Sequence, residues 1–114
     1  MLKNEVTINE SGALSHLVRV RALQMVNNAR ASHIGSALSI ADIVAVLYAR
    51  ILCVKSSLPD WPMRDRFILS KGHACVALYA ALAEQGFFSV SLLESYGQDF
   101  SDFMNHVSHK VPGI

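Results

Sequence analysis

The chain has 114 residues and a mass of 12.5 kDa, which is the size of one ordinary domain. Hydrophobic residues make up 52% of it and charged residues 17%, so its composition excludes an intrinsically disordered chain. Ten basic and nine acidic side chains give a net charge of +1, which provides no electrostatic footprint for nucleic acid or an anionic membrane. Cys53 and Cys75 are too few for a disulfide framework, so we expect buried thiols in a reduced, cytoplasmic protein.

Targeting segments are not evident in the sequence. Met1–Glu5 lacks the basic-then-apolar order of a signal peptide. The most apolar stretch, Ile40–Val54, contains Asp42 and Arg50 and is shorter than the about 18–20 residues that a membrane span requires. We therefore expect a soluble chain without a membrane partner.

Two helices are predicted in the first half of the chain. Apolar residues recur at steps of three and four over Ser11–Arg30, which predicts an amphipathic helix with Ser11 as its N-cap and His16 on its surface. A second helix is predicted to begin at Ser39, because Ser39 and Asp42 form a capping pattern. Its apolar residues then cover nearly the whole circumference, which indicates a helix buried on several sides in a larger packed body.

The second half begins with a predicted loop over residues 55–65. Arg66–Ser70 is a short apolar run typical of a buried strand, and a helix is expected to follow it until Gly86. A short helix is predicted over Ser91–Tyr96, capped by Ser91, and no periodicity is evident from Gly97 onward.

This order of elements predicts an α/β fold that is mostly helical, with one or few parallel strands. A strand followed by a turn and a helix is typical of an α/β sheet. A lone strand leaves its backbone groups unpaired, so the other strands are expected outside this chain. Val111–Ile114 is an apolar, turn-like end without a closing element, and we expect the chain to be cut off there.

The end of the predicted strand is the strongest local candidate for a site. Ligands of open α/β sheets bind beyond the carboxyl ends of strands, and a helix N-terminus attracts phosphate. Gly72 permits close approach of a ligand, while Lys71 and His73 offer charge and hydrogen bonds. Gly-His at a helix start is also common turn chemistry, so the spacing alone leaves both interpretations open.

Histidines in loops are the other candidates. His33 lies in a polar loop of small residues, and His106 and His109 lie in the final irregular segment. The spacing of the last two suits a metal pair only on a helix, so a small metal carrier is the least favoured hypothesis. His33, His73 and His106 together suggest an anionic or polyhydroxylated ligand, without naming a reaction.

Three segments carry a resemblance to a known family. They are Ala31–Ser39, the highly specific Asp65–Ala74, and His106 together with Val111–Ile114. On these residues the chain resembles transketolase, in the N-terminal part of its thiamine-diphosphate-binding domain, and looks closest to the bacterial form split into two chains. The related deoxyxylulose-phosphate synthases have a different sequence before their histidine. The resemblance implies that residues 1–114 form a partial domain of this kind.

The resemblance also implies roles for individual residues. His33 would contact the sugar donor near the reacting centre, and His106 would lie by the donor's C1 hydroxyl, so both would be catalytic and substrate-binding. His73, with Gly72, would bind the cofactor diphosphate, and thiamine diphosphate itself would carry the carbanion chemistry.

The chain departs from the family pattern in two respects. The family has Gly-His-Pro followed by an acidic residue where this chain has Asn105, His106, Val107 and Ser108. The sequence also has no Gly-Asp-Gly with a downstream Asn, which in the family bind Mg²⁺ or Ca²⁺, and no activating glutamate of the partner domain. We therefore expect no metal ligands in this chain and expect those of the cofactor's metal to lie outside it.

Two functions remain open on this basis. The first is a fragment or subunit of a transketolase-like enzyme that moves a two-carbon ketol unit between sugar phosphates, inactive alone and completed by a complementary chain or in a homodimer. The alternative is a non-catalytic helical interaction module that docks on such a chain.

Overall fold

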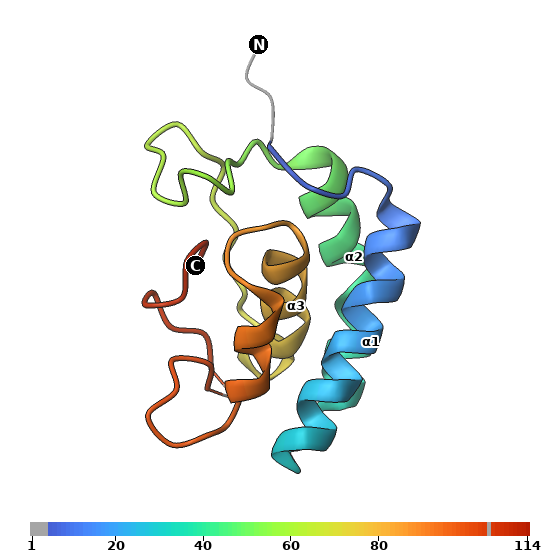
Figure 1. Cartoon of the computed structure of the whole chain (residues 1–114). Helices are drawn as coiled ribbons and strands as arrows, with labels where there is room; N and C mark the ends of the chain where they lie inside the picture. Colours follow the sequence, from blue (N-terminus) through green and yellow to red (C-terminus); the bar gives the residue numbers. More distant parts are fainter. Residues whose placement is uncertain (1–4, 105) are drawn as a thin grey trace.

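Helices dominate the described part of the chain, which comprises residues 5–104 and 106–114 of a computed structural model. These residues form α1 (Ser11–Ala29), α2 (Ile34–Val46), a π-helical turn η1 (Leu47–Ile51), and then η2 (Gly72–Ala74), α3 (Cys75–Glu84) and η3 (Val90–Ser95). α1 and α2 run side by side, α3 packs against both, and the final segment lies on the other side of α3 (Figure 1).

α1 confirms the predicted amphipathic helix. Its buried side chains include the predicted Leu14, Val18, Ala22 and Met25, and His16 is exposed. The predicted N-cap is wrong by one residue, because the carboxylate of Glu10 accepts hydrogen bonds from the first-turn amides at 2.9 and 2.5 Å. A carboxylate at this position also favours the positive end of the helix dipole.

α2 begins five residues earlier than the sequence pattern predicts. Ser39 is therefore inside the helix, where its hydroxyl donates to the carbonyl of Ser36 at 2.7 Å instead of capping. Asp42 accepts a hydrogen bond from Arg19 of α1 at 2.8 Å. This bond, with a second one from the hydroxyl of Ser15, lowers the pKa of Asp42 to about 2.

α2 is the most apolar helix of the described chain. Residues 34–51 are long and apolar enough to cross a bilayer by length and composition alone, a test that core helices also pass. α2 packs against both α1 and α3, which favours a core helix. The outer face of α2 and η1 stays uncovered, with Ile43 of α2 and Ile51 of η1 60% and 59% exposed, so the prediction of burial on several sides is met only in part.

α3 is the central helix of the core. Every side chain from Cys75 to Ala83 is buried. The helix ends at Glu84, close to the predicted stop, because Gly86 adopts a left-handed φ of 88° that places its amide and the next one on the last carbonyls. The buried Gln85 follows the helix and binds the backbone of Ile8 and Tyr48.

The predicted strand does not form within the described residues. Arg66–Ser70 is extended, with half-buried Phe67 and Leu69 alternating with an 86% exposed Ile68. No backbone hydrogen bond joins this segment to another part of the described chain. A strand needs a neighbouring strand, and the nearest approach to one in these residues is an isolated parallel bridge between Glu5 and Lys55. The mostly helical character is thus confirmed, and the α/β sheet stays a prediction.

The short helix in the second half is displaced by one residue from its prediction. η3 runs from Val90 to Ser95, and its cap is Ser89, whose hydroxyl accepts from the amide of Ser91 at 3.3 Å. Leu93 anchors this turn in the core. The segment from Gly97 onward contains no helix in its described part, as the missing periodicity predicts.

Candidate functional site

The starts of two helical segments meet at one place on the surface. His33 precedes α2 and adopts a left-handed backbone with φ of 72°, and His73 lies in η2, which leads directly into α3. No side chain caps the start of α2, η2 or α3. Uncapped first-turn amides and the positive ends of helix dipoles attract anions, so this meeting point is suited to a phosphate group.

Three imidazoles from separate segments gather at this point. The rings of His33 and His73 stack with centroids 4.3 Å apart and planes 7° from parallel. The ring of His106 lies 4.9 Å from that of His73 and is tilted by 54°. All three side chains are exposed, so they can reach a ligand.

A cleft of about 490 Å³ opens beside these rings, and we call it the histidine cleft. Such a volume lies within the range of small-ligand pockets. Lys71 contributes a positive charge at its edge, held by a 2.9 Å hydrogen bond from its ammonium to the hydroxyl of Ser39 on α2. The residues that line it are Ser36, Leu69, Ser70, Lys71, Gly72, His73, His106 and Val107.

Gly72 has a steric role in the histidine cleft. A Cβ atom on Gly72 would lie 2.8 Å from Nδ1 of His106, closer than carbon and nitrogen atoms pack in proteins. The imidazole of His106 therefore rests directly on the backbone of Gly72. The glycine leaves room for a histidine, in addition to any room that it leaves for a ligand.

Behind the histidine cleft lies a buried layer of polar side chains on and near α3. Burial raises the pKa of Cys75 to about 11, so its thiol is protonated at neutral pH and is a poor nucleophile. Burial also raises the pKa of Tyr79 and that of Tyr96, the latter to about 12. These groups are neutral hydrogen-bonding partners and do not act as acids or bases near pH 7.

The structure brings together every site residue that the sequence singled out. Gly72, His73 and His106 line the histidine cleft, and His33 stacks on His73 without lining the cleft itself, whereas His109 does not line it. Asn105 lies outside the described residues. Sequence reasoning assigned no role to Ser36 or Val107, because small and apolar loop residues carry no signal of their own. Within the described residues no group of three or more His, Cys, Asp or Glu side chains is arranged to hold a metal ion.

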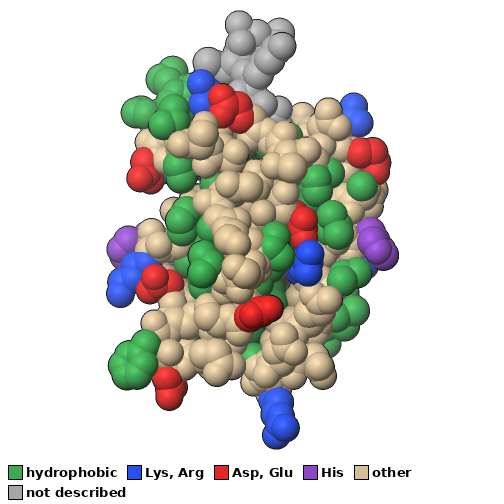
Figure 2. All heavy atoms as spheres, in the orientation of Figure 1, with side chains coloured by type: hydrophobic (Ala, Val, Ile, Leu, Met, Phe, Trp, Pro, Cys, Tyr) green, Lys and Arg blue, Asp and Glu red, His purple; other side chains and the backbone are tan. Residues whose placement is uncertain are grey.

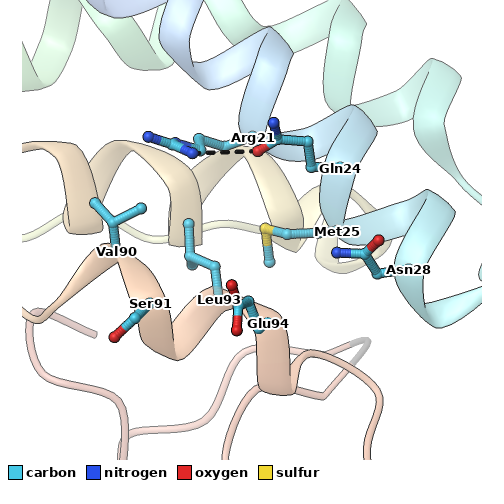
Figure 3. A pocket seen from close by; sticks show the side chains of 8 residues that line it. All are labelled: Arg21, Gln24, Met25, Asn28, Val90, Ser91, Leu93 and Glu94. Carbon is cyan, nitrogen blue, oxygen red and sulfur yellow. Dashed lines mark hydrogen bonds between the residues drawn. The ribbon is translucent and has the colours of Figure 1, made fainter.

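A second hollow, of about 360 Å³, lies between α1 and η3 (Figure 3). Its main charged group is already paired, since Arg21 donates to Glu84 at 2.7 Å and to Gln24 at 3.2 Å. None of the predicted site residues lines it. On the molecular face of Figure 2, acidic and basic side chains are interspersed without a broad patch of one sign. The histidine cleft is therefore the better candidate site.

This fold and site define a known class of protein. The model of the transketolase family's thiamine diphosphate binding domain matches residues 11–113. The chain therefore belongs to the transketolase family, within that domain, as the three sequence segments indicate.

Individual relatives agree with this assignment. The chain is 37% identical over 92 residues to the 6-deoxy-6-sulfo-D-fructose transketolase subunit of Clostridium sp. (strain MSTE9), covering 81% of this chain and 34% of the relative. It is 38% identical over 96 residues to an apulose-4-phosphate transketolase subunit of Phocaeicola vulgatus, covering 84% and 34%. Transketolase from Leishmania mexicana has a similar structure, with a TM-score of 0.86 and 29% identity over 94% of this chain and 16% of that one. The chain thus spans about a third of the length of these subunit relatives.

Proposed function

We propose that this chain supplies the diphosphate-binding end of a transketolase-type active site, in an assembly that moves a two-carbon ketol unit between sugar phosphates. One observation carries the proposal: three imidazoles from separate segments gather where the uncapped starts of two helical segments meet. Membership of the family supports it.

The cofactor of this assembly is thiamine diphosphate, and the residues present fit its anionic end. The starts of α2 and η2 offer unpaired amides, and Lys71 and His73 add charge and hydrogen-bond donors. Gly72 and His73 would hold the diphosphate, while the ligands of the accompanying Mg²⁺ or Ca²⁺ lie outside this chain. When bound, the cofactor supplies the carbanion chemistry of ketol transfer.

His33 and His106 serve the donor sugar in this proposal. Their imidazoles each contact the ring of His73 and are exposed, so a sugar hydroxyl or carbonyl oxygen can reach their ring nitrogens. A neutral imidazole accepts a proton at one ring nitrogen and donates one from the other, which carbonyl addition and release require near pH 7.

A complementary transketolase-like chain, or a second copy, completes the site. Two surfaces support this: the extended segment Arg66–Ser70 with no backbone hydrogen bond to another part of the described chain, and the uncovered face of α2 and η1 with Ile43 and Ile51. The relatives named as subunits support it as well. The chain alone is then inactive, and the assembled enzyme works in the cytoplasm on sugar phosphates.

Calorimetry and co-expression test the proposal. Titration of the purified chain with thiamine diphosphate and Mg²⁺ is expected to give no saturable binding at micromolar concentration. Co-expression with a complementary chain is expected to produce ketol transfer that His33→Ala and His73→Ala abolish. His16→Ala is the matched control, because His16 is an exposed histidine on α1 outside the histidine cleft. Tight binding by the chain alone, or equal loss in the control, contradicts the proposal.

A non-catalytic interaction module is the second candidate. The uncovered apolar face of α2 favours it, since such a face is typical of a docking surface. The two candidates differ in the co-expression experiment: a stable complex that shows no ketol transfer, and whose formation is insensitive to His73→Ala, indicates the module.

A further inference from the structure

A buried hydroxyl group on α3 binds the loop that carries His106 at two points. Tyr79 is fully buried near the middle of α3. Its hydroxyl lies 2.9 Å from the carbonyl oxygen of Met104 and 3.1 Å from that of His106. A phenol has one proton, so this proton is shared between the two carbonyls. The hydroxyl of Tyr79 therefore binds the carbonyls on both sides of position 105.

The surroundings of Tyr79 fix the direction of this hydroxyl. Its ring packs edge to face on Phe103 with centroids 5.2 Å apart, and the ring of Tyr96 lies 6.3 Å away. Cys75, one helical turn earlier, also donates its thiol to the carbonyl of Met104 at 3.5 Å. Burial raises the pKa of Tyr79, so the hydroxyl keeps its proton and remains a donor.

The imidazole of His106 is confined from a second side. Its Nδ1 lies so close to Gly72 that a Cβ atom on residue 72 would be only 2.8 Å from it. His73 faces the same ring at 4.9 Å. An exposed histidine on an irregular loop has several rotamers available, and these two contacts and the anchored backbone reduce that choice.

We propose that Tyr79 is a positioning residue that holds His106 in the histidine cleft, with Gly72 leaving the space that the imidazole occupies. The catalytic consequence rests on the proposed function, in which His106 serves the donor sugar. The positional part does not, because it concerns where the ring of His106 lies in this chain.

NMR of the full chain tests the positional part. The histidine Cε1–H resonances are assigned with single His→Gln variants and compared between the wild type, Tyr79→Phe and Tyr48→Phe. Tyr79→Phe keeps the aromatic ring and removes only the hydroxyl, so we expect the His106 resonance to move toward its random-coil position while that of His16 stays in place. Tyr48→Phe is the matched control, because Tyr48 is another buried tyrosine and does not line the histidine cleft, and we expect the His106 resonance to stay. Gly72→Ala is expected to move it as Tyr79→Phe does.

Two outcomes overturn the positional proposal. One is a folded Tyr79→Phe chain whose His106 resonance is unchanged. The other applies if Tyr79→Phe does not fold: a wild-type chain in which the Tyr79 hydroxyl proton exchanges with water as fast as an exposed phenol contradicts the shared hydrogen bond.

Kinetics of the co-expressed assembly test the catalytic part. We expect Tyr79→Phe to lower kcat/KM for the donor sugar about tenfold, the size of one net hydrogen bond, and Tyr48→Phe to leave it within about twofold. A shifted His106 resonance with unchanged kcat/KM refutes the role of His106 in the proposed function and leaves the positional inference standing. An unshifted resonance refutes the inference whatever the kinetics.

Discussion

Gln85 offers the sharpest test of how the described fold is held together. It is fully buried at the end of α3, where its amide oxygen accepts from the amide of Ile8 at 2.7 Å. Its side-chain nitrogen donates to the carbonyl of Ile8 at 2.6 Å and to that of Tyr48 at 3.4 Å. One side chain thus joins the N-terminal segment, η1 and α3. Gln85→Ala removes all three bonds.

The size of the effect follows from these contacts. Each of the two short bonds contributes about 1 kcal/mol net, and the carbonyl of Tyr48, left without this partner in the interior, costs about another 1 kcal/mol. We therefore expect the free energy of unfolding to fall by about 2–4 kcal/mol, which is a large part of the about 5–15 kcal/mol typical of a domain. The corresponding fall in Tm is roughly 10–20 °C for a chain of this size.

Urea and thermal unfolding followed by far-UV circular dichroism measure this loss. Gln98→Ala is the matched control, because Gln98 is exposed, and we expect a change within about 0.5 kcal/mol. Gln85→Glu adds a pH signature: its carboxylate would face two carbonyl oxygens, which raises the folded-state pKa above the unfolded value of about 4.3. The stability of this variant is then greatest below pH 4 and falls as the pH rises. A Gln85→Ala chain as stable as the control, or a Gln85→Glu chain that gains stability with rising pH, refutes the reasoning.

Three further predictions concern packing and pH. Gly113→Ala should lower the free energy of unfolding by about 1–3 kcal/mol, because φ is 95° and the new Cβ would lie 2.8 Å from a methyl of Leu82; Gly35→Ala, with no atom within 4 Å, should leave it unchanged or higher in the same melts. Burial raises the pKa of Cys75 from 9.0 to about 11, so stability present below pH 9 should decline between pH 9 and 11, and Cys75→Ala should flatten that part of the urea-midpoint profile. The hydrogen bond from its arginine partner lowers the pKa of Asp42 to about 2, so its contribution is present above pH 3.8 and is lost as the pH falls toward 2; Asp42→Asn should lower stability at pH 7 and reduce this acid dependence. A steeper acid slope in that variant contradicts the assignment.

Helix positions could be predicted from the sequence where apolar spacing was the dominant signal. The stripe of α1 was recognisable because one face of that helix, from Leu14 to Met25, is buried over about three turns. Helix starts were harder to predict from the sequence, because neighbouring residues compete to cap the same helix. Glu10 caps α1 in place of Ser11, and His33 precedes α2 with a left-handed backbone that no residue pattern indicates. Ser39 and Asp42 match the capping pattern, but their side chains form other hydrogen bonds.

The candidate site could be predicted as a set of residues but not as an arrangement. The histidines were identifiable one by one from their loop positions and from the family resemblance. Their ring contacts bring together positions up to 73 residues apart, so they depend on the packing of α2 against α3. Tyr79 escaped notice because, in a buried helix, a tyrosine has the same pattern as any core residue, and its hydroxyl partner appears only in the folded loop.

The extended segment Arg66–Ser70 also has a consequence for the behaviour of the chain in solution. Its amides and carbonyls form no backbone hydrogen bond to another part of the described chain, and Ile68 at its centre is 86% exposed. Such an edge can form hydrogen bonds to an extended strand of another molecule. Copies of the chain in which this edge is uncovered are therefore prone to aggregate through it.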